Sequence, residues 1–126
     1  MKKLISLIAI FFAFACNAQT WPSGNSTALT LDVGGTTSLT ITNKMQHVAS
    51  IPTLTANLTI NVAVSSQIKA GAIMLITVKT TSTETTTYSG SIVAPVVTGV
   101  AGKTWSQAFI YNGTNFYPCG AKIQVD

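Results

Sequence analysis

The stretch Leu58-Thr59-Ile60-Asn61-Val62-Ala63-Val64 decides the fold class. Its larger aliphatic side chains recur at every second position and alternate with threonine, asparagine and alanine. A period of two places these aliphatic side chains on one face of an extended strand, whereas a helix would distribute them around its axis. The stretch therefore predicts a β-strand with one face in the core and the other in solvent.

The segments before this strand show the same period of two. Aliphatic residues alternate with polar ones from Leu29 to Val33, and Leu39 and Ile41 do so among threonines. Gly34-Gly35 lies between the two segments, and a glycine pair between alternating stretches is typical of a tight β-hairpin. The sequence therefore predicts an antiparallel hairpin centred on these two glycines.

Segments further along the chain extend the strand pattern. Residues 72–78 are apolar with little alternation, which favours a strand buried on both faces. Residues 80–87 are nearly all threonine, which suits a pleated, hydrated surface, so they predict an exposed strand or hairpin arm. Residues 65–71 predict a single helical turn or a loop. Residues 91–98, which contain a proline, predict an edge or broken strand.

The C-terminal third completes the pattern. Trp105 to Tyr111 alternates again, Asn112 to Asn115 is a turn signal, Phe116-Tyr117 begins a return strand, and Ala121 to Val125 predicts a last strand. The total is about eight short strands with frequent turn signals and no long helix. This spacing predicts an all-β fold, a single small β-sandwich or jelly-roll-like domain of antiparallel strands.

The N-terminal residues predict a secretory signal peptide that is cleaved after Ala18. Met1-Lys2-Lys3 precedes an apolar run from Leu4 to Ala15, which is shorter than the roughly 20 residues that span a bilayer. Two alternatives stay open, lipidation at Cys16 and retention of the segment. The predicted location is outside the cell or on its surface. The predicted organisation is a signal peptide (1–18), an irregular leader (19–26) and a β-sandwich domain (27–126).

Composition excludes some classes of function. The chain has seven Lys+Arg against three Asp+Glu, but two of the lysines precede the predicted cleavage site and no residue is arginine. Because phosphate and base-edge recognition depends on the planar guanidinium, no nucleic-acid partner is predicted. A surface whose polarity comes from Thr, Ser and Asn repels its copies weakly, so a homo-oligomer is expected.

Catalysis needs titratable side chains that act together, and few are present. His47 is the single histidine and is predicted to be a partly exposed strand residue, while Asp32 and Glu84 lie on other predicted strands. Glu84 falls in the threonine-rich run and is predicted to be solvated. No cluster of His, Cys, Asp or Glu has metal-ligand spacing. The sequence therefore predicts no enzyme, no catalytic residue, no metal and no cofactor.

Cysteine usage bears on the predicted export. After cleavage Cys119 is the one remaining cysteine, so an intrachain disulfide is excluded. An odd thiol in an exported protein is either buried or paired with another chain. The turn-like Pro118-Cys119-Gly120 beside a strand favours burial, and an interchain disulfide is the alternative.

Aromatic side chains concentrate on one predicted strand. Trp105, Phe109 and Tyr111 share a face of it, and cross-strand aromatics commonly stabilise a hairpin core, which is the favoured interpretation. The alternative is a stacking platform for sugar rings, helped by the nearby Asn112 and Asn115. These five residues are the candidate ligand-binding set.

The stretch Ala108-Phe109-Ile110-Tyr111-Asn112-Gly113-Thr114-Asn115-Phe116-Tyr117 resembles the closing hairpin of small β modules in phage head-fibre, decoration and tail-fibre proteins. In those modules an aromatic strand meets an Asn/Asp-Gly-Thr turn and an aromatic return strand. The resemblance implies a role on the virion surface and a trimer, whereas the signal segment implies export by a bacterial cell.

These observations predict a non-enzymatic structural or adhesive β module displayed on a virion or cell surface. Its expected partners are copies of itself, with a trimer favoured, and other virion or cell-surface proteins. The alternative is a secreted carbohydrate-binding module that uses the aromatic strand face, with glycans as its ligands.

Overall fold

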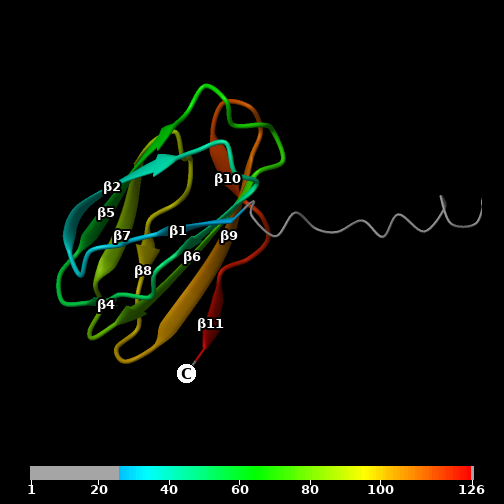
Figure 1. Ribbon diagram of the computed structural model, residues 1–126. Coiled ribbons are helices and arrows are strands. Elements are labelled where there is room, and N and C mark those ends of the chain that lie inside the picture. The colour runs from blue at the N-terminus through cyan, green and yellow to red at the C-terminus, as the bar shows by residue number, and fades with distance from the viewer. Residues whose placement is uncertain (1–25, 126) are drawn as a thin grey trace, which may run out of the picture.

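The computed structural model describes residues 26–125, which form two packed β-sheets and contain no helix (Figure 1). Sheet A has seven strands, which are β1 (Ser26–Leu29), β3 (Gln46–Ala49), β4 (Thr53–Leu54), β6 (Ile73–Thr80), β9 (Thr104–Tyr111), β10 (Phe116–Pro118) and β11 (Ile123–Val125). Sheet B has four strands, which are β2 (Gly35–Ile41), β5 (Leu58–Val64), β7 (Thr85–Gly90) and β8 (Val97–Thr98). The predicted all-β class is confirmed.

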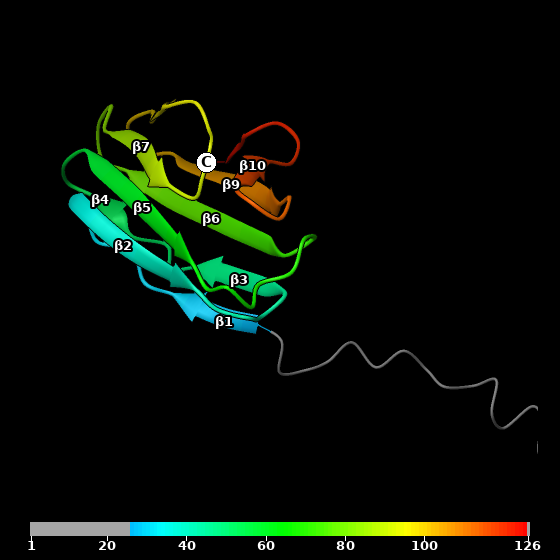
Figure 2. The same ribbon diagram turned by 90° about the horizontal axis from the view of Figure 1, so that it is seen from above.

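The chain changes sheet at most of its early connections. It runs from β1 in sheet A to β2 in sheet B, returns to β3 and β4, and then passes through β5, β6 and β7 in alternate sheets. The neighbouring strands β1, β3 and β6 are parallel to one another, and so are β2, β5 and β7. Figure 2 shows β2, β5 and β7 in one layer and β3, β6 and β9 in the other. The first part of the domain is therefore a coil that winds through both layers.

The predicted set of about eight antiparallel strands is wrong in number and in direction. Residues 26–125 contain eleven strands, and the sheets mix parallel with antiparallel pairs. The antiparallel pairs are β6–β9, β9–β10, β9–β11 and β7–β8. In sheet A, β9 pairs with β6, and in sheet B, β8 pairs with β7, so antiparallel strands follow the parallel set of each sheet. The topology is therefore not that of an antiparallel jelly roll.

The hairpin predicted at Gly34-Gly35 is a corner between the sheets. β1 and β2, which flank it, belong to different sheets, and β2 pairs with β5 from Gly35↔Leu58 to Ile41↔Val64. A Cβ built on Gly34 would lie 2.8 Å from the Cβ of Ala56, and Gly35 has a φ of +79°. Glycine is needed here for a sharp bend and a close approach, which are requirements that a corner and a hairpin share.

Alternation along each long strand builds the core between the layers. The strand predicted at 58–64 is confirmed as β5, and Leu58, Ile60 and Val62 are each at most 1 % exposed. β9 buries Trp105, Gln107, Phe109 and Tyr111 in the same way. The predicted turn at 112–115 is confirmed between β9 and β10, and the predicted last strand is β11.

Two strands depart from their predicted burial. β6 is buried on one face only, because Ile73 and Leu75 point outward and are 47 % and 37 % exposed. The threonine-rich run is exposed only in part. Residues 81–83 are exposed, whereas Thr80 and Thr86 are fully buried and β7 is an inner strand of sheet B. Thr80 is accommodated because its hydroxyl donates to the carbonyl oxygen of Val100 at 2.7 Å.

The remaining segments lie close to their predicted roles. Residues 65–71 form a loop without a helical turn, and β8 is a short edge strand of sheet B, as the proline in 91–98 predicts. Ser26 already belongs to β1 rather than to the predicted leader. The signal peptide (1–18), its cleavage site and Cys16 lie outside the described residues. No helical segment able to cross a bilayer occurs in the part of the chain that the structure describes.

His47 is buried rather than partly exposed, which corrects the prediction. It lies on β3 with its side chain between the sheets and is 1 % exposed. Its Nε2–H donates to the carbonyl oxygen of Lys44 at 2.9 Å, and its buried Nδ1 has no hydrogen-bond partner. Burial lowers the pKa of His47 from its ordinary 6.5, an effect that the hydrogen bond to Lys44 opposes in part.

We predict that His47 makes the fold sensitive to mild acid. The pKa of His47 is lower in the folded chain than in the unfolded one, so the unfolded chain binds a proton more readily. The stabilising effect of neutral His47 is therefore complete above pH 6.5, and the free energy of unfolding decreases as the pH falls from 6.5 toward the folded pKa. Urea unfolding at pH values between about 7.5 and 5 should show this slope. His47→Gln should remove most of it. An equal slope in the variant would contradict the assignment, because the Glu84 carboxyl, whose pKa is lowered from 4.5, acts only at lower pH.

We also predict that Gly90→Ala destabilises the fold more than Gly102→Ala. Both glycines have positive φ, +76° and +72°, which costs an alanine about 1–2 kcal/mol. A Cβ on Gly90 would in addition collide with the carbonyl oxygen of Val62, whereas a Cβ on Gly102 meets nothing within 4 Å. Urea unfolding should therefore give a loss of about 3 kcal/mol for Gly90→Ala and about 1 kcal/mol for the control. Equal losses would contradict the close pairing of β5 and β7.

Candidate functional site

The aromatic candidates lie in the core. Trp105, Phe109 and Tyr111 are 1 %, 0 % and 6 % exposed, because the face of β9 that they share points toward sheet B. Phe109 meets Tyr88 edge to face at 5.6 Å between ring centroids, and Tyr111 packs on Phe116 at 5.1 Å. The rings stabilise the sandwich and offer no open surface on which a sugar could stack.

The two asparagine candidates belong to the turn between β9 and β10. The side-chain oxygen of Asn112 accepts hydrogen bonds from the backbone N–H groups of Thr114 and Asn115, both at 2.9 Å. Asn112 is exposed and Asn115 is half-buried. This capping arrangement accounts for Asn112 as a turn residue, and the two asparagines do not converge on a common site with the buried rings.

The structure does not bring the titratable side chains together. Asp32 is exposed and accepts a hydrogen bond from the Thr37 hydroxyl at 2.9 Å, while His47 lies in the core. Glu84 is 9 % exposed, which corrects the prediction that it is solvated. Its carboxylate accepts from the Thr81 hydroxyl at 2.6 Å and from the Ser82 N–H at 2.8 Å, and these bonds lower its pKa. Among residues 26–125, no group of three His, Cys, Asp or Glu side chains gathers in one place.

Cys119 is exposed, which corrects the predicted burial. Its N–H donates to the carbonyl oxygen of Ala108 at 2.8 Å, so it follows β10 alongside β9. Tyr117 pairs with Ile110 on the outward side of the sheet and Pro118 with Phe109 on the inward side. Alternation therefore turns Cys119 outward again.

The outward side of sheet A carries exposed apolar side chains on neighbouring strands. We call it the outer apolar face and define it by Val48, Ile73, Leu75, Ile110 and Tyr117, each between 37 % and 49 % exposed. The strand register joins these residues into rows. Val48 is opposite Leu75, and Leu75 is opposite Ala108. In the next row Ile73 is opposite Ile110, and Ile110 is opposite Tyr117.

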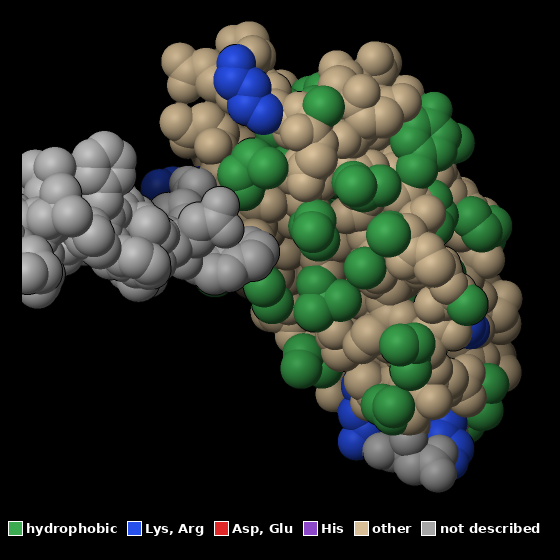
Figure 3. Space-filling view, turned by 90° about the vertical axis from the view of Figure 1, so that its right-hand side faces the viewer, with side chains coloured by type: hydrophobic (Ala, Val, Ile, Leu, Met, Phe, Trp, Pro, Cys, Tyr) green, Lys and Arg blue, Asp and Glu red, His purple; other side chains and the backbone are tan. Residues whose placement is uncertain are grey.

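Charge is sparse on this side of the molecule. Figure 3 shows hydrophobic side chains spread over it, with basic side chains toward its two ends and no acidic side chain in view. Toward the far end of β6 the face becomes polar, with Thr77 and Ser106 hydrogen-bonded at 2.8 Å and Lys79 beyond them. The sequence signal for this face is the lack of alternation in 72–78, because the outward Ile73 and Leu75 are as apolar as their buried neighbours.

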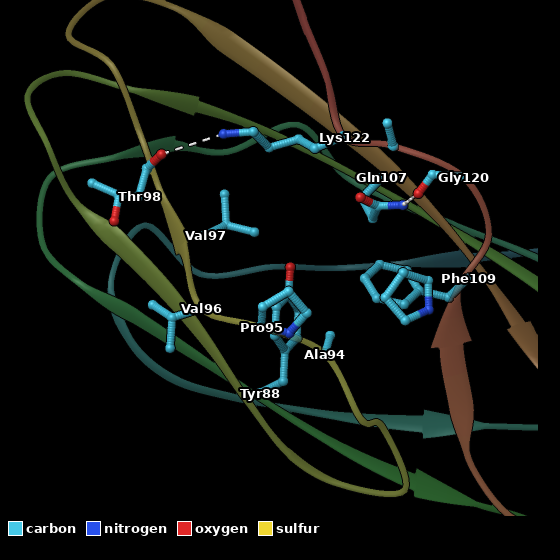
Figure 4. A pocket seen from close by; sticks show the side chains of 12 residues that line it. Tyr88, Ala94, Pro95, Val96, Val97, Thr98, Gln107, Phe109, Gly120 and Lys122 are labelled. Carbon is cyan, nitrogen blue, oxygen red and sulfur yellow. Dashed lines mark hydrogen bonds between the residues drawn. The ribbon is translucent and has the colours of Figure 1, made fainter.

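A cavity of about 340 Å³ opens on the other side of sheet A, between the two layers (Figure 4). One wall is β7, β8 and the segment 94–96, and the other is β9 with residues 118–122. The cavity exists because β8 is only two residues long and pairs with β7 alone. Its volume lies at the lower end of the range of small-molecule pockets, about 300–1,000 Å³.

Four polar residues line the cavity, which are Tyr88, Thr98, Gln107 and Lys122. Gln107 donates through Nε2 to the carbonyl oxygens of Gly120 at 3.0 Å and Ala108 at 3.1 Å, which holds the segment after β10 in place. Lys122 extends across the opening, where its Nζ is 3.5 Å from the carbonyl oxygen of Thr98. The hydroxyl of Tyr88 is buried without a hydrogen-bond partner, an arrangement that costs about 1–3 kcal/mol. Sequence reasoning missed this site because its residues come from distant segments.

No protein-family model, curated protein or solved structure matches this chain. The resemblance to phage surface modules therefore stays a prediction from the sequence, and the function has to rest on the outer apolar face and the cavity.

Proposed function

We propose that the protein is a non-enzymatic structural module, displayed on a virion or cell surface, which assembles with copies of itself through the outer apolar face. The observation that carries the proposal is the row structure of that face. Its large aliphatic and aromatic side chains are exposed on neighbouring strands and in register. A continuous apolar patch on a small domain commonly marks a surface that another protein covers.

The chemistry of the face fits a second copy of the chain. Apolar side chains across the centre are complementary to the same side chains on a copy, as an interface with two-fold symmetry requires. Lys79 lies four residues from Leu75 along β6, or about 13 Å at the rise of a strand. The like charges of two copies therefore lie at the rim of such an interface, outside its apolar centre.

The surface location and the number of copies rest on the sequence. The apolar run before Ala18 supports export, and the resemblance to phage head-fibre, decoration and tail-fibre modules supports virion display and a trimer. A structural role also agrees with the separation of His47, Asp32 and Glu84, which share no site that could perform acid–base chemistry. The carbohydrate-binding alternative gains no support, because the rings it depends on are buried.

We predict that the purified protein is a stable homo-oligomer and that Ile73→Lys reduces it to a monomer. The substitution places a charge in the centre of the outer apolar face, where a covering copy would have to desolvate it. Ile73 is 47 % exposed, so the folded monomer tolerates the lysine. Multi-angle light scattering at micromolar concentration measures the mass, and circular dichroism checks that the fold is intact.

Val100→Lys is the matched control. Val100 is also 47 % exposed, but it lies in the turn before β9 and away from the outer apolar face. It should retain the wild-type mass. A wild-type monomer, or an oligomer that Ile73→Lys leaves intact while it stays folded, would contradict assembly through this face. A trimer supports the resemblance to phage modules, and a dimer supports the face without that resemblance.

A further inference from the structure

We propose that the cavity between β8, β9 and residues 118–122 binds a small monocarboxylate with an apolar body. The cavity lies on the inward side of sheet A, whereas the outer apolar face lies on the outward side. The proposal is therefore independent of self-assembly.

The walls of the cavity suit an apolar ligand body. Phe109 and Val97 line it from β9 and β8, and Pro95 lines it from the segment between β7 and β8 (Figure 4). All three side chains lack polar atoms, so a ligand of matching shape gains free energy mainly from leaving water. Ordinary packing would have closed this space if β8 extended over it.

The opening of the cavity favours an anion. Lys122 is exposed, and its ammonium group makes one long hydrogen bond, 3.5 Å to the carbonyl oxygen of Thr98. No Asp or Glu lines the cavity, and no carboxylate of residues 26–125 pairs with this lysine. A ligand carboxylate would replace the Thr98 carbonyl oxygen as the partner of the Lys122 ammonium group. The new hydrogen bond is stronger, because both of its partners are charged.

Tyr88 supplies a second donor at the floor. Figure 4 shows its side chain rising between Val97 and Gln107, and the hydroxyl has no hydrogen-bond partner. Burial raises the pKa of this hydroxyl well above its ordinary 10, so it stays protonated and able to donate at neutral pH. Side-chain rotations are common when a ligand enters a site, and a small one brings the buried hydroxyl to a carboxylate oxygen.

The residues that line the cavity disfavour two other classes of ligand. A sugar carries many hydroxyl groups, and the cavity offers few polar partners because both Nε2 bonds of Gln107 are already used. Its remaining hydroxyls would lose water without replacement. A plain hydrocarbon would leave the Tyr88 hydroxyl unpaired and the Lys122 charge unused. A compact acid satisfies both groups.

The experiment titrates the ¹⁵N-labelled purified protein with phenylacetate and, separately, with the neutral phenylacetamide, followed by amide chemical shifts. Phenylacetate should produce saturable shifts at residues 94–98, 107–109 and 118–122, with affinity at least about fivefold above that of the amide. Lys122→Gln should remove this preference, and Tyr88→Phe should weaken phenylacetate binding about fivefold. Neither variant touches the outer apolar face, so the oligomer mass should not change.

Lys69→Gln is the matched control for loss of one positive charge, since Lys69 is exposed in the loop before β6 and does not line the cavity. It should bind phenylacetate as the wild type does. The proposal is overturned by the absence of saturable shifts up to about 20 mM, by equal affinity for acid and amide, or by equal losses in Lys122→Gln and Lys69→Gln. Binding that survives in Lys122→Gln with its acid preference intact also overturns it.

Discussion

The parallel pairing of β2 with β5 and of β5 with β7 is the constraint on which the rest of the structure depends. Parallel neighbours cannot be joined by a tight turn, so the chain has to leave the sheet between them. Here it leaves by crossing to sheet A, where β3 and β6 form the matching parallel set. Each crossing wraps the chain around the space between the layers, and every second side chain of the inner strands then points into one shared core.

The outer apolar face and the cavity both arise where this coil ends. β9 adds antiparallel to β6, and β10 and β11 pair with different parts of β9, which widens sheet A to seven strands. Sheet B gains only the short β8 and stays at four strands. The wider sheet presents an outward face that no further layer of residues 26–125 covers. The narrower sheet leaves the cavity beneath the segment that connects β7 to β8.

A strand was predictable from the sequence where the alternation within its own segment was sufficient to identify it. The alternation in Leu58–Val64 and Thr104–Tyr111 identifies both strands and their buried faces, because inward and outward side chains differ in every second position. The strand pairing was not predictable, because β2 pairs with β5, and β3 and β4 lie between them in the sequence. The glycines at 34 and 35 fit a sheet-to-sheet corner as well as a hairpin, and the local sequence does not separate the two.

The candidate site was predictable only in part, for the same reason. The aromatic cluster on β9 was identified, and its favoured core interpretation agrees with the burial of Trp105. Threonine content predicts exposure for 80–87, but Thr80 is buried because its hydroxyl reaches a carbonyl oxygen, and Thr86 is buried although its hydroxyl has no partner. The cavity joins Tyr88 to Lys122, which only the tertiary fold brings together.

The direction of strand pairing tests the central claim most directly, and interstrand nuclear Overhauser effects between backbone protons measure it. The account predicts contacts whose residue numbers rise together, from Leu58 with Thr86 to Val62 with Gly90, and likewise from Thr37 with Ile60 to Leu39 with Val62. Within 29–64, contacts in which one number rises as the other falls, such as Leu31 with Ser38 and Leu29 with Thr40 across the Gly34-Gly35 corner, would contradict it and restore an antiparallel sandwich.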